Sequence, residues 1–329
     1  YETDIHKNYD EKGEFIMKVD KIIKNAKVFT SDVKHLNASA FAVNDGKFVY
    51  VGDEAGLKDF EGEVVDLGGK FVTPALMDSH VHLACPVGMN YSVPATNIIC
   101  SNKAEALDFI RNYVNENPDS KEYTFVLRLG DLCGEKLVKE ELDAICSDKK
   151  MLIREEEFHS GWVNSKCMEE MGVDDDTPDI APGLSYYDRD ENGHKTGYMF
   201  EMTMVGTLLS HAKNLTDEQI HESLLPWIEF CKTAGVSAVF EAGSPDAAEF
   251  HEHVYDVLKK MDEDGELPII VDCSYSICSH EMLNGIMDIL KRYREKYNTK
   301  HMRFNTLKIM LDGTLRIHTG SLVTPYPGT

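Results

Sequence analysis

The sequence predicts an α/β protein whose core is a parallel sheet. Apolar segments of strand length alternate with amphipathic helical segments from about residue 71 onward. No internal repeat or low-complexity tract interrupts this alternation. It is typical of parallel sheets, because each parallel connection needs a crossover that is usually a helix. A run of short β-like clusters before residue 73 predicts a separate N-terminal sheet layer.

The composition is that of a globular protein with a strong acidic surplus. The chain has 329 residues, of which 57 are acidic and 34 basic, so its formal net charge is −23. This charge argues against partners that present phosphates, so we expect neither nucleic acid nor an anionic membrane surface as a partner. There is no run of about 18 apolar residues, which predicts no membrane-spanning helix. Eight cysteines without a Cys-x-x-Cys pair predict reduced thiols and a cytoplasmic location.

The N-terminal region divides into a polar segment and a β-rich segment. Residues 1–19 are polar and acidic without an apolar signal-peptide core, so we expect a leader or tail there. Residues 20–73 contain short clusters of β-branched and aromatic side chains separated by turn residues. Between two such clusters, residues 44–46 read Asn-Asp-Gly and predict a hairpin, because these residue types tolerate positive φ.

From residue 71 the pattern becomes strand, polar loop and helix. An apolar strand over residues 71–77 runs directly into Asp78-Ser79-His80-Val81-His82. The further predicted strands are 123–129, 150–153, 236–240, 268–274 and 306–311. The predicted helices are 104–114, 140–145, a helix that opens with a capping signature at 216–219 and ends near 234, 247–261 and 282–296. Residues 174–192 are rich in Asp, Gly and Pro and predict a long loop.

The clearest chemical signal is the pair His80 and His82. Residues i and i+2 of a strand point to the same side, so both imidazoles would face one space. Neutral imidazoles are good ligands for zinc and similar ions, and catalytic groups collect where barrel strands end. The pair therefore predicts a divalent metal site. The alternative is a pair of ordinary surface or core histidines.

Four motifs carry a resemblance to a known family. Residues 71–83, with Ala75 where a glycine is usual, resemble the strand-one signature of the amidohydrolase superfamily. Residues 157–166, Glu-Phe-His-Ser-Gly-Trp-Val-Asn-Ser-Lys, are similar to a motif of amidohydrolase family 3, the branch typified by N-substituted formamide deformylase. Residues 197–201 and 307–314 resemble two further motifs of that branch. With the motifs in family order, the resemblance covers roughly residues 20–325.

The resemblance implies a TIM barrel, (β/α)8, flanked by a small β-sandwich. Residues 20–73 would supply part of the sandwich, and residues 74–329 the N-terminal half of the barrel with an insertion at about 104–215. The strand-five and strand-six histidines of the family, and its strand-eight general-base aspartate, have no counterpart in this chain. We therefore expect a fragment or a natural half, completed by a C-terminal half in the same or a separate chain. A homodimer is left open.

The resemblance also implies a metal-dependent hydrolase that cleaves an amide or related C–N bond of a small-molecule substrate. Its metal ligands would be His80, His82 and Lys308, the last as a carbamylated lysine that bridges two metals. One or two divalent ions, of which zinc is the leading choice, would activate the attacking water. His159 is the expected catalytic residue, at the carbonyl oxygen. An unmodified Lys308 would instead snorkel or lie on an edge strand.

Three further residues are substrate-pocket candidates, each with a structural alternative. Trp162 could pack in a core, and Glu201 could cap a helix or lie on a solvated face. Asp312, four residues after Lys308, could position a loop or a ligand. His159 has its own alternative, as a polar core residue bonded to a backbone carbonyl.

Two other patterns do not predict sites. His251 and His253 also read His-x-His, but on a helix such side chains diverge by about 200°, so we expect a solvated face. Residues 155–157, Glu-Glu-Glu, read as a charge run rather than a general-base pair. Two functional alternatives stay open: a deaminase of the same superfamily with one metal and no bridging lysine, and a non-catalytic binding or assembly half.

Overall fold

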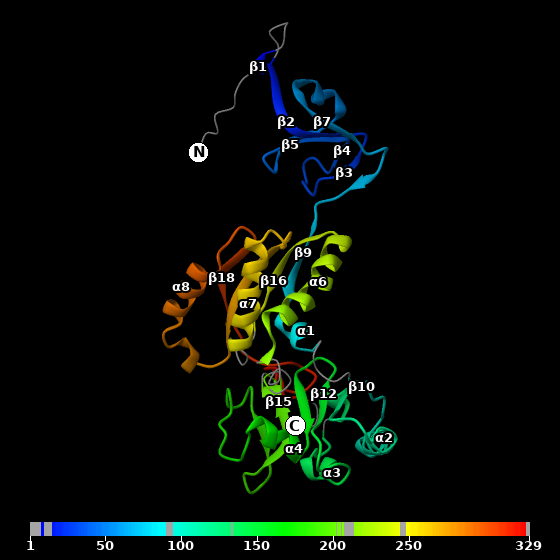
Figure 1. Cartoon of the computed structure of the whole chain (residues 1–329), viewed down its shortest axis with the longest axis vertical. Coiled ribbons are helices and arrows are strands. Elements are labelled where there is room, and N and C mark those ends of the chain that lie inside the picture. The colour runs from blue at the N-terminus through cyan, green and yellow to red at the C-terminus, as the bar shows by residue number, and fades with distance from the viewer. Residues whose placement is uncertain are drawn as a thin grey trace. The chain divides into compact units, whose positions relative to one another are not determined.

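The structure, a computed structural model, describes residues 8–9, 15–89, 95–132, 134–201, 203–204, 206, 214–243 and 248–326. The chain separates into two compact units, Tyr1–Leu76 and Met77–Thr329 (Figure 1). We describe each unit by itself. No helix within the described ranges is both long enough and apolar enough to cross a membrane.

Within its described residues, the first unit contains two sheets. The larger sheet has five strands, β1 (Asn8–Tyr9), β2 (Phe15–Lys24), β5 (Ala40–Asn44), β6 (Lys47–Gly52) and β7 (Phe60–Asp66). The central strand β2 pairs antiparallel with β5 and parallel with β7. The smaller sheet joins β3 (Lys27–Phe29), β4 (Asn37–Ala38) and β8 (Phe71–Val72), and a 3-10 helix, η1 (Glu54–Asp59), precedes β7.

The hairpin predicted at residues 44–46 is confirmed. Strands β5 and β6 are antiparallel, and Asn44 lies opposite Lys47. The two residues between them, Asp45 and Gly46, have φ of 49° and 69°. A two-residue hairpin turn of this kind needs positive φ at both positions, which Asp and Gly adopt at low cost.

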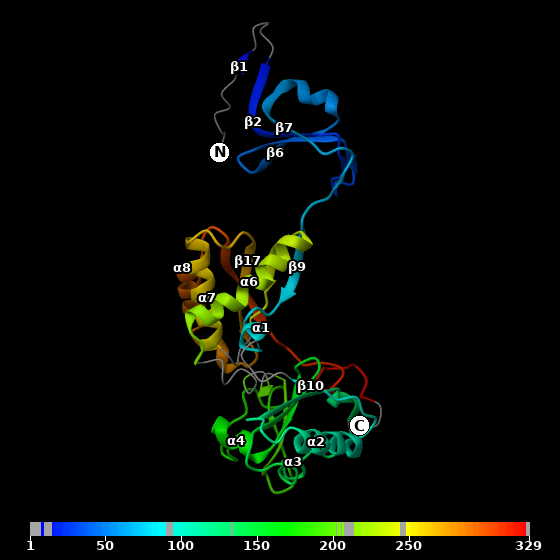
Figure 2. The ribbon, with the colours of Figure 1, turned by 45° about the vertical axis from the view of Figure 1, so that its right-hand side comes forward.

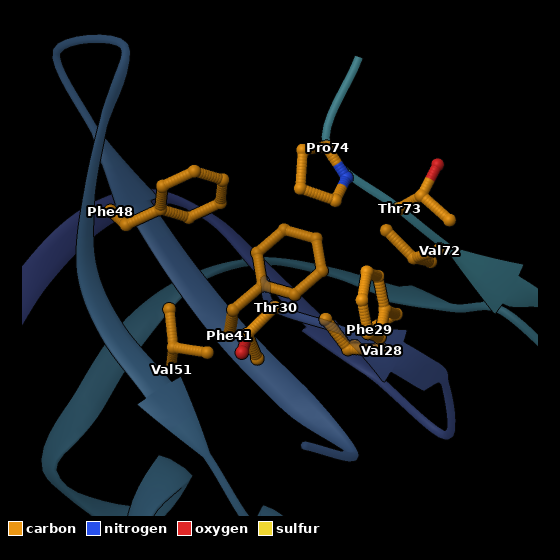
Figure 3. A pocket seen from close by; sticks show the side chains of 9 residues that line it. All are labelled: Val28, Phe29, Thr30, Phe41, Phe48, Val51, Val72, Thr73 and Pro74. Carbon is orange, nitrogen blue, oxygen red and sulfur yellow. The ribbon is translucent and has the colours of Figure 1, made fainter. Parts of the chain in front are cut away.

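An apolar pocket of about 150 Å³ lies within the first unit. Figure 3 shows Phe41 at its centre, between Phe48 on one side and Val28 on the other. The remaining lining side chains are Phe29, Thr30, Val51, Val72, Thr73 and Pro74. No charged side chain lines this pocket, so it offers packing surface rather than reactive groups.

The second unit is built around an open four-stranded sheet, in the order β18-β17-β16-β9. Its strands are β9 (Leu76–Val81), β16 (Val236–Glu241), β17 (Ile270–Ile277) and β18 (Met302–Ile309). Strands β16, β17 and β18 are parallel neighbours, joined by α7 (Ala248–Glu263) and α8 (Ile286–Tyr297). The α/β prediction is confirmed. Since the described strands form no closed sheet, the barrel stays a prediction.

Helices cover one face of this sheet. Figures 1 and 2 show α6 (Asp217–Ala234), α7 and α8 side by side along it. Their contact with the strands forms the largest buried apolar cluster, to which Val271 and Phe304 contribute from strands and Leu258 and Tyr297 from helices. The burial of this face stabilises the unit and fixes where the ends of the strands lie.

The capping signature at residues 216–219 is also confirmed. The Thr216 hydroxyl accepts a hydrogen bond from the backbone N–H of Gln219, and the Gln219 side chain accepts one from the backbone N–H of Thr216. Helix α6 ends at Gly235, whose φ of 75° is the left-handed conformation that a terminating glycine adopts readily.

A second sheet lies between β9 and α6 in sequence. Its order is β10-β11-β12-β13-β15-β14, with β10 to β12 parallel and the other pairs antiparallel. These strands are β10 (Thr96–Asn97), β11 (Tyr123–Leu127), β12 (Met151–Glu155), β13 (Ser160–Val163), β14 (Tyr187–Arg189) and β15 (Lys195–Phe200). The helices of this region whose full bounds the structure describes are α1 (Ala84–Met89), α2 (Lys103–Glu116), α3 (Lys139–Asp143) and α4 (Ser165–Met171). The loop prediction for residues 174–192 was wrong at β14, a three-residue strand paired with β15 that the Asp-rich composition did not indicate.

Candidate metal and hydrolase site

His80 and His82 converge at the end of β9. Their Nε2 atoms lie 3.2 Å apart, and their ring planes cross at 70°. Two nitrogen ligands at 2.0–2.1 Å from one tetrahedral zinc ion would be about 3.3 Å apart. The donor atoms and their spacing therefore fit two ligands of one metal ion. Among the described residues, however, no group of three His, Cys, Asp or Glu side chains is arranged to hold a metal.

The imidazole of His82 is favoured in its neutral form. Burial of the ring lowers its pKa to about 4, and the positive charges of Lys308, His80 and His159 add to this effect. A neutral imidazole has a lone pair available for a metal ion. The same interactions show that Lys308, His80 and His159 all lie within electrostatic range of His82.

A buried glutamate that the sequence analysis missed lies beside this pair. Glu241 ends β16 and is 0% exposed, and its carboxylate accepts hydrogen bonds from the backbone N–H groups of Leu83, at 2.5 Å, and Gly243, at 2.8 Å. Burial raises its pKa to about 7, although these hydrogen bonds and the charge of Lys308 oppose the rise. Glu241 thus holds the chain just after His82. The sequence does carry a signal for Glu241, because an acidic residue stands at the end of an apolar strand. The predicted strand 236–240 ended one residue too early to include it.

Lys308 is half-buried on β18, where it lies opposite Ser276 of β17. Burial lowers the pKa of Lys308, and the carboxylate of Glu241 opposes this shift. The amine therefore lies near a buried acid and near His82, rather than in open solvent. The structure does not test whether Lys308 binds a metal or is carbamylated, and both stay predictions.

His159 and Glu201 are in direct contact. The His159 Nδ1 atom lies 2.5 Å from the Glu201 Oε2 atom, and the Glu201 side chain is only 1% exposed while that of His159 is 30% exposed. Glu201 follows β15, and its backbone N–H donates to the His159 carbonyl oxygen at 2.7 Å. Glu201 does not lie on a solvated face; it is the buried partner of His159.

The other pocket candidates lie in different surroundings. Trp162 is 0% exposed in the core of the second sheet, and its Nε1 donates to the carbonyl oxygen of Val138 at 3.0 Å. This position gives no support for contact with a substrate. Asp312 is exposed and accepts a hydrogen bond from the backbone N–H of Ser321 at 2.9 Å, so it closes the loop that follows β18.

The loop after β18 also contacts the second sheet, through an ion pair with a buried glutamate. Arg316 lies 3.6 Å from Glu155 and 3.3 Å from Glu157, measured between its guanidinium nitrogens and a carboxylate oxygen of each. Glu155 is 0% exposed, so the charge run predicted for residues 155–157 is wrong for this residue. A buried carboxylate requires a partner, and the arginine that supplies it is more than 150 residues away in sequence.

The solvated face predicted for the helical histidines is wrong for His251. This residue of α7 is 3% exposed, and burial lowers its pKa to about 3. Its neighbour His253 instead pairs with Asp217 at 2.7 Å near the surface. The two histidines diverge as expected on a helix, and one of them turns into the core beside Tyr255.

A cavity of about 360 Å³ lies beside β15. Tyr198 and Phe200 of β15 line it together with Ile317, which belongs to the loop after β18. The other lining residues are Leu129, Leu132, Gly134, Glu135, Lys136, Leu137 and Asp188. The cavity thus combines aromatic surface with charged groups, and Phe200 directly precedes Glu201.

Comparison with known proteins identifies the family of this chain. The model of the amidohydrolase family matches residues 63–329, which is most of the sequence and includes every candidate site residue. The chain belongs to the amidohydrolase family. The family predicted from the four motifs is therefore confirmed.

The individual relatives have low sequence identity to this chain. The chain is 27% identical over 313 residues to the exoenzymes regulatory protein AepA of Pectobacterium carotovorum subsp. carotovorum, covering 93% of this chain and 66% of the relative. It is 26% identical over 187 residues to the N-substituted formamide deformylase of Arthrobacter pascens, covering 55% of this chain and 34% of the relative. The chain thus spans between one third and two thirds of these curated relatives.

A solved structure shares the fold. An uncharacterized metal-dependent hydrolase from Pyrococcus horikoshii OT3 superposes with a TM-score of 0.57 at 23% identity, covering 94% of this chain and 59% of that one. At this identity the likeness speaks for the fold alone.

Proposed function

We propose that this amidohydrolase chain is part of a metal-dependent hydrolase that cleaves an amide or related C–N bond. The observation that carries the proposal is the convergence of the His80 and His82 Nε2 atoms, 3.2 Å apart, at the end of β9. Family membership supports it, and so does the presence of Lys308 and His159 within electrostatic range of His82.

The metal is proposed as a divalent ion, with zinc the leading choice. His80 and His82 would hold it, and Lys308 would join them as a carbamate formed from its neutral amine and carbon dioxide. When bound, the ion would lower the pKa of water and polarise the scissile carbonyl. Glu241 would hold the backbone after His82 in place through its bonds to Leu83 and Gly243.

His159 would bind the substrate carbonyl oxygen. Its Nδ1 is occupied by Glu201, so Nε2 is the nitrogen that remains for a substrate, and Nε2 would have to carry a second ring proton in order to donate to the carbonyl oxygen. The cavity lined by Tyr198 and Phe200 is the candidate for the non-reacting part of a small-molecule substrate. Asp312 would act indirectly, by holding the loop that carries Ile317.

The four-stranded sheet is proposed as half of a (β/α)8 barrel, with the first unit as part of a β-sandwich. The parallel order β16-β17-β18 supports this, since successive parallel strands joined by helices are the repeating unit of such barrels. A C-terminal half, in the same or a separate chain, would supply the general-base aspartate and two further histidines.

The test is hydrolysis by the complete polypeptide after loading with zinc. N-formyl, N-acyl and lactam substrates are compared by the release of carboxylate and amine. We expect turnover that is lost in His80→Ala and retained in His253→Ala, a matched histidine that pairs with Asp217 away from the site. Ammonia release from an amino-substituted ring without amide hydrolysis would favour the deaminase. Binding of these compounds without turnover would favour the non-catalytic alternative.

A further inference from the structure

Glu201 joins two segments that are far apart in sequence. One oxygen of its carboxylate, Oε2, contacts Nδ1 of His159 at 2.5 Å. The other, Oε1, accepts hydrogen bonds from the backbone N–H of Thr314, at 3.2 Å, and from the hydroxyl of Thr319. Both threonines belong to the loop that follows β18, more than 110 residues after Glu201.

The backbone at Glu201 is itself unusual. Its φ is 55°, a left-handed conformation that residues other than glycine, asparagine and aspartate adopt rarely. Such a conformation persists only where the surroundings hold it. Here the Glu201 N–H donates to His159, and its carbonyl accepts from the N–H of Met204 at 3.0 Å.

The loop after β18 is folded around this carboxylate. Its backbone closes on itself through Gly313 N–H to the Thr319 carbonyl, at 3.1 Å, and Gly320 N–H to the Thr314 carbonyl, at 2.9 Å. A Cβ atom on Gly313 would overlap both Glu201 Oε1 and the Thr319 hydroxyl, so this position requires glycine. Thr319 also accepts a hydrogen bond at its hydroxyl from the Thr314 N–H, at 2.9 Å.

An ionised carboxylate can only accept hydrogen bonds, so its contact with His159 requires a proton on Nδ1. That assigns Nε2 as the ring nitrogen available to a substrate and orients the ring. The two bonds from the β18 loop in turn set the position of the carboxylate, because the side chain is buried and has little freedom to rotate. The position of the loop is thereby transmitted to the imidazole.

We infer that Glu201 is a positioning residue that couples the loop after β18 to His159, fixing the tautomer and orientation of the imidazole through its buried carboxylate. This inference rests on the proposed function only in so far as His159 meets the substrate. A purely structural role would tie the loop to the second sheet without changing the state of the His159 ring.

The test compares two threonines of one loop. Thr319→Val removes the hydroxyl that bonds Glu201 and keeps the shape of the side chain. Thr314→Val is the matched control, because the Thr314 hydroxyl makes no hydrogen bond to any residue that the structure describes, while its backbone N–H is kept. Thr319→Ser restores the hydroxyl. Two readouts are needed: the nitrogen resonances of His159 in protein with 15N-labelled histidine, assigned with His159→Gln, and hydrogen exchange of the loop amides.

For Thr319→Val we expect a change in the protonation pattern of the His159 ring nitrogens. We also expect exchange of the Gly313, Thr314 and Gly320 amides to be roughly tenfold faster or more, as loss of a hydrogen bond to a charged group implies. Thr314→Val should show neither change, and Thr319→Ser should restore both.

An unchanged His159 spectrum in Thr319→Val, with or without faster loop exchange, would overturn the coupling. If Thr319→Val does not fold, the isosteric Glu201→Gln takes its place. Its amide can donate to Nδ1, so the inference requires an altered tautomer, and an unaltered one would refute it. These readouts need neither metal nor turnover, so failure of the proposed hydrolase function would leave them unaffected.

Discussion

The His159 Nδ1 atom lies 2.5 Å from the Oε2 atom of Glu201, a carboxylate that is 99% removed from solvent and comes from the end of a different strand. A partly exposed imidazole backed by a buried carboxylate has a defined orientation and a defined protonated nitrogen. This pair connects the second sheet to the loop after β18, and therefore to the strand that carries Lys308.

Replacing Gly313 with alanine should destabilise the protein. The added Cβ would overlap Glu201 Oε1 and the Thr319 hydroxyl, and both groups are held in place by hydrogen bonds. Overpacking of this kind costs about 1–3 kcal/mol. Chemical denaturation measures the loss. Gly320→Ala is the milder comparison, since a Cβ there would lie 3.2 Å from the Tyr326 hydroxyl and 3.3 Å from the Thr314 backbone without overlapping either. Equal stability of the two variants would contradict the described packing.

Asp262→Asn should reduce stability in a pH-dependent way. Burial would raise the pKa of Asp262, but hydrogen bonds from Thr299 and from the His301 backbone and ring outweigh it and hold the pKa below its usual 3.8. A lowered pKa in the folded state means that the carboxylate stabilises the fold above pH 3.8, and that this contribution is lost as pH falls through the folded pKa.

The expected cost of Asp262→Asn is about 2–4 kcal/mol at pH 7, as for removal of a buried charged partner. The difference from the parent should shrink as the pH falls below about 3.8, the pKa of the unfolded carboxyl. Urea denaturation at pH values from 7 to below 3.8 measures this difference in the free energy of unfolding. A cost that stays constant with pH would show that the charge on Asp262 does not contribute.

Lys195→Met should be among the most destabilising single changes. The Lys195 side chain is 0% exposed, and its ammonium donates to the backbone carbonyls of Asp174, Asp175 and Thr177. Its removal leaves these carbonyls without their charged donor, at a cost of about 3 kcal/mol or more. Thermal unfolding tests this. Lys166→Met, at a partly exposed lysine that pairs with Glu169, should change stability by no more than about 0.5 kcal/mol.

Lys308→Met should abolish any dependence of metal binding on carbon dioxide. In the parent, added bicarbonate should raise the amount of zinc bound, because the proposed carbamate supplies a carboxylate ligand. Zinc content after equilibrium dialysis with and without bicarbonate measures this effect. Lys291→Met, at an exposed lysine of α8, is the control and should behave as the parent. A bicarbonate effect that survives in Lys308→Met would rule out the bridging role.

Local sequence patterns predicted the elements of the fold better than its buried charges. Strands β16, β17 and β18 overlap the apolar runs that predicted them, since burial of such runs is their main source of stability. The strand predicted over residues 71–77 was wrong in its bounds, because this stretch is divided between β8 of the first unit and β9. The hairpin at Asp45 and Gly46 followed from turn chemistry alone. These features depend on residues close together in sequence.

The charged interior depends on contacts that no local pattern contains. Glu155 reads as part of a charge run, yet it is buried against Arg316, and Glu201 is bonded to Thr319 across 118 residues. His251 turns into the core because its face of α7 meets the sheet, which the local sequence did not indicate. Only the arrangement of the elements shows which acids and histidines acquire buried partners.

If His80 and His82 bind a metal ion, their joint removal must change the amount of zinc that the chain binds. The parent and the double variant His80→Ala/His82→Ala are dialysed against the same zinc solution, with His253→Ala as control, and the zinc bound per chain is measured. We expect the double variant to lose the zinc that the parent and the control retain. A double variant that binds as much zinc as the parent would contradict it.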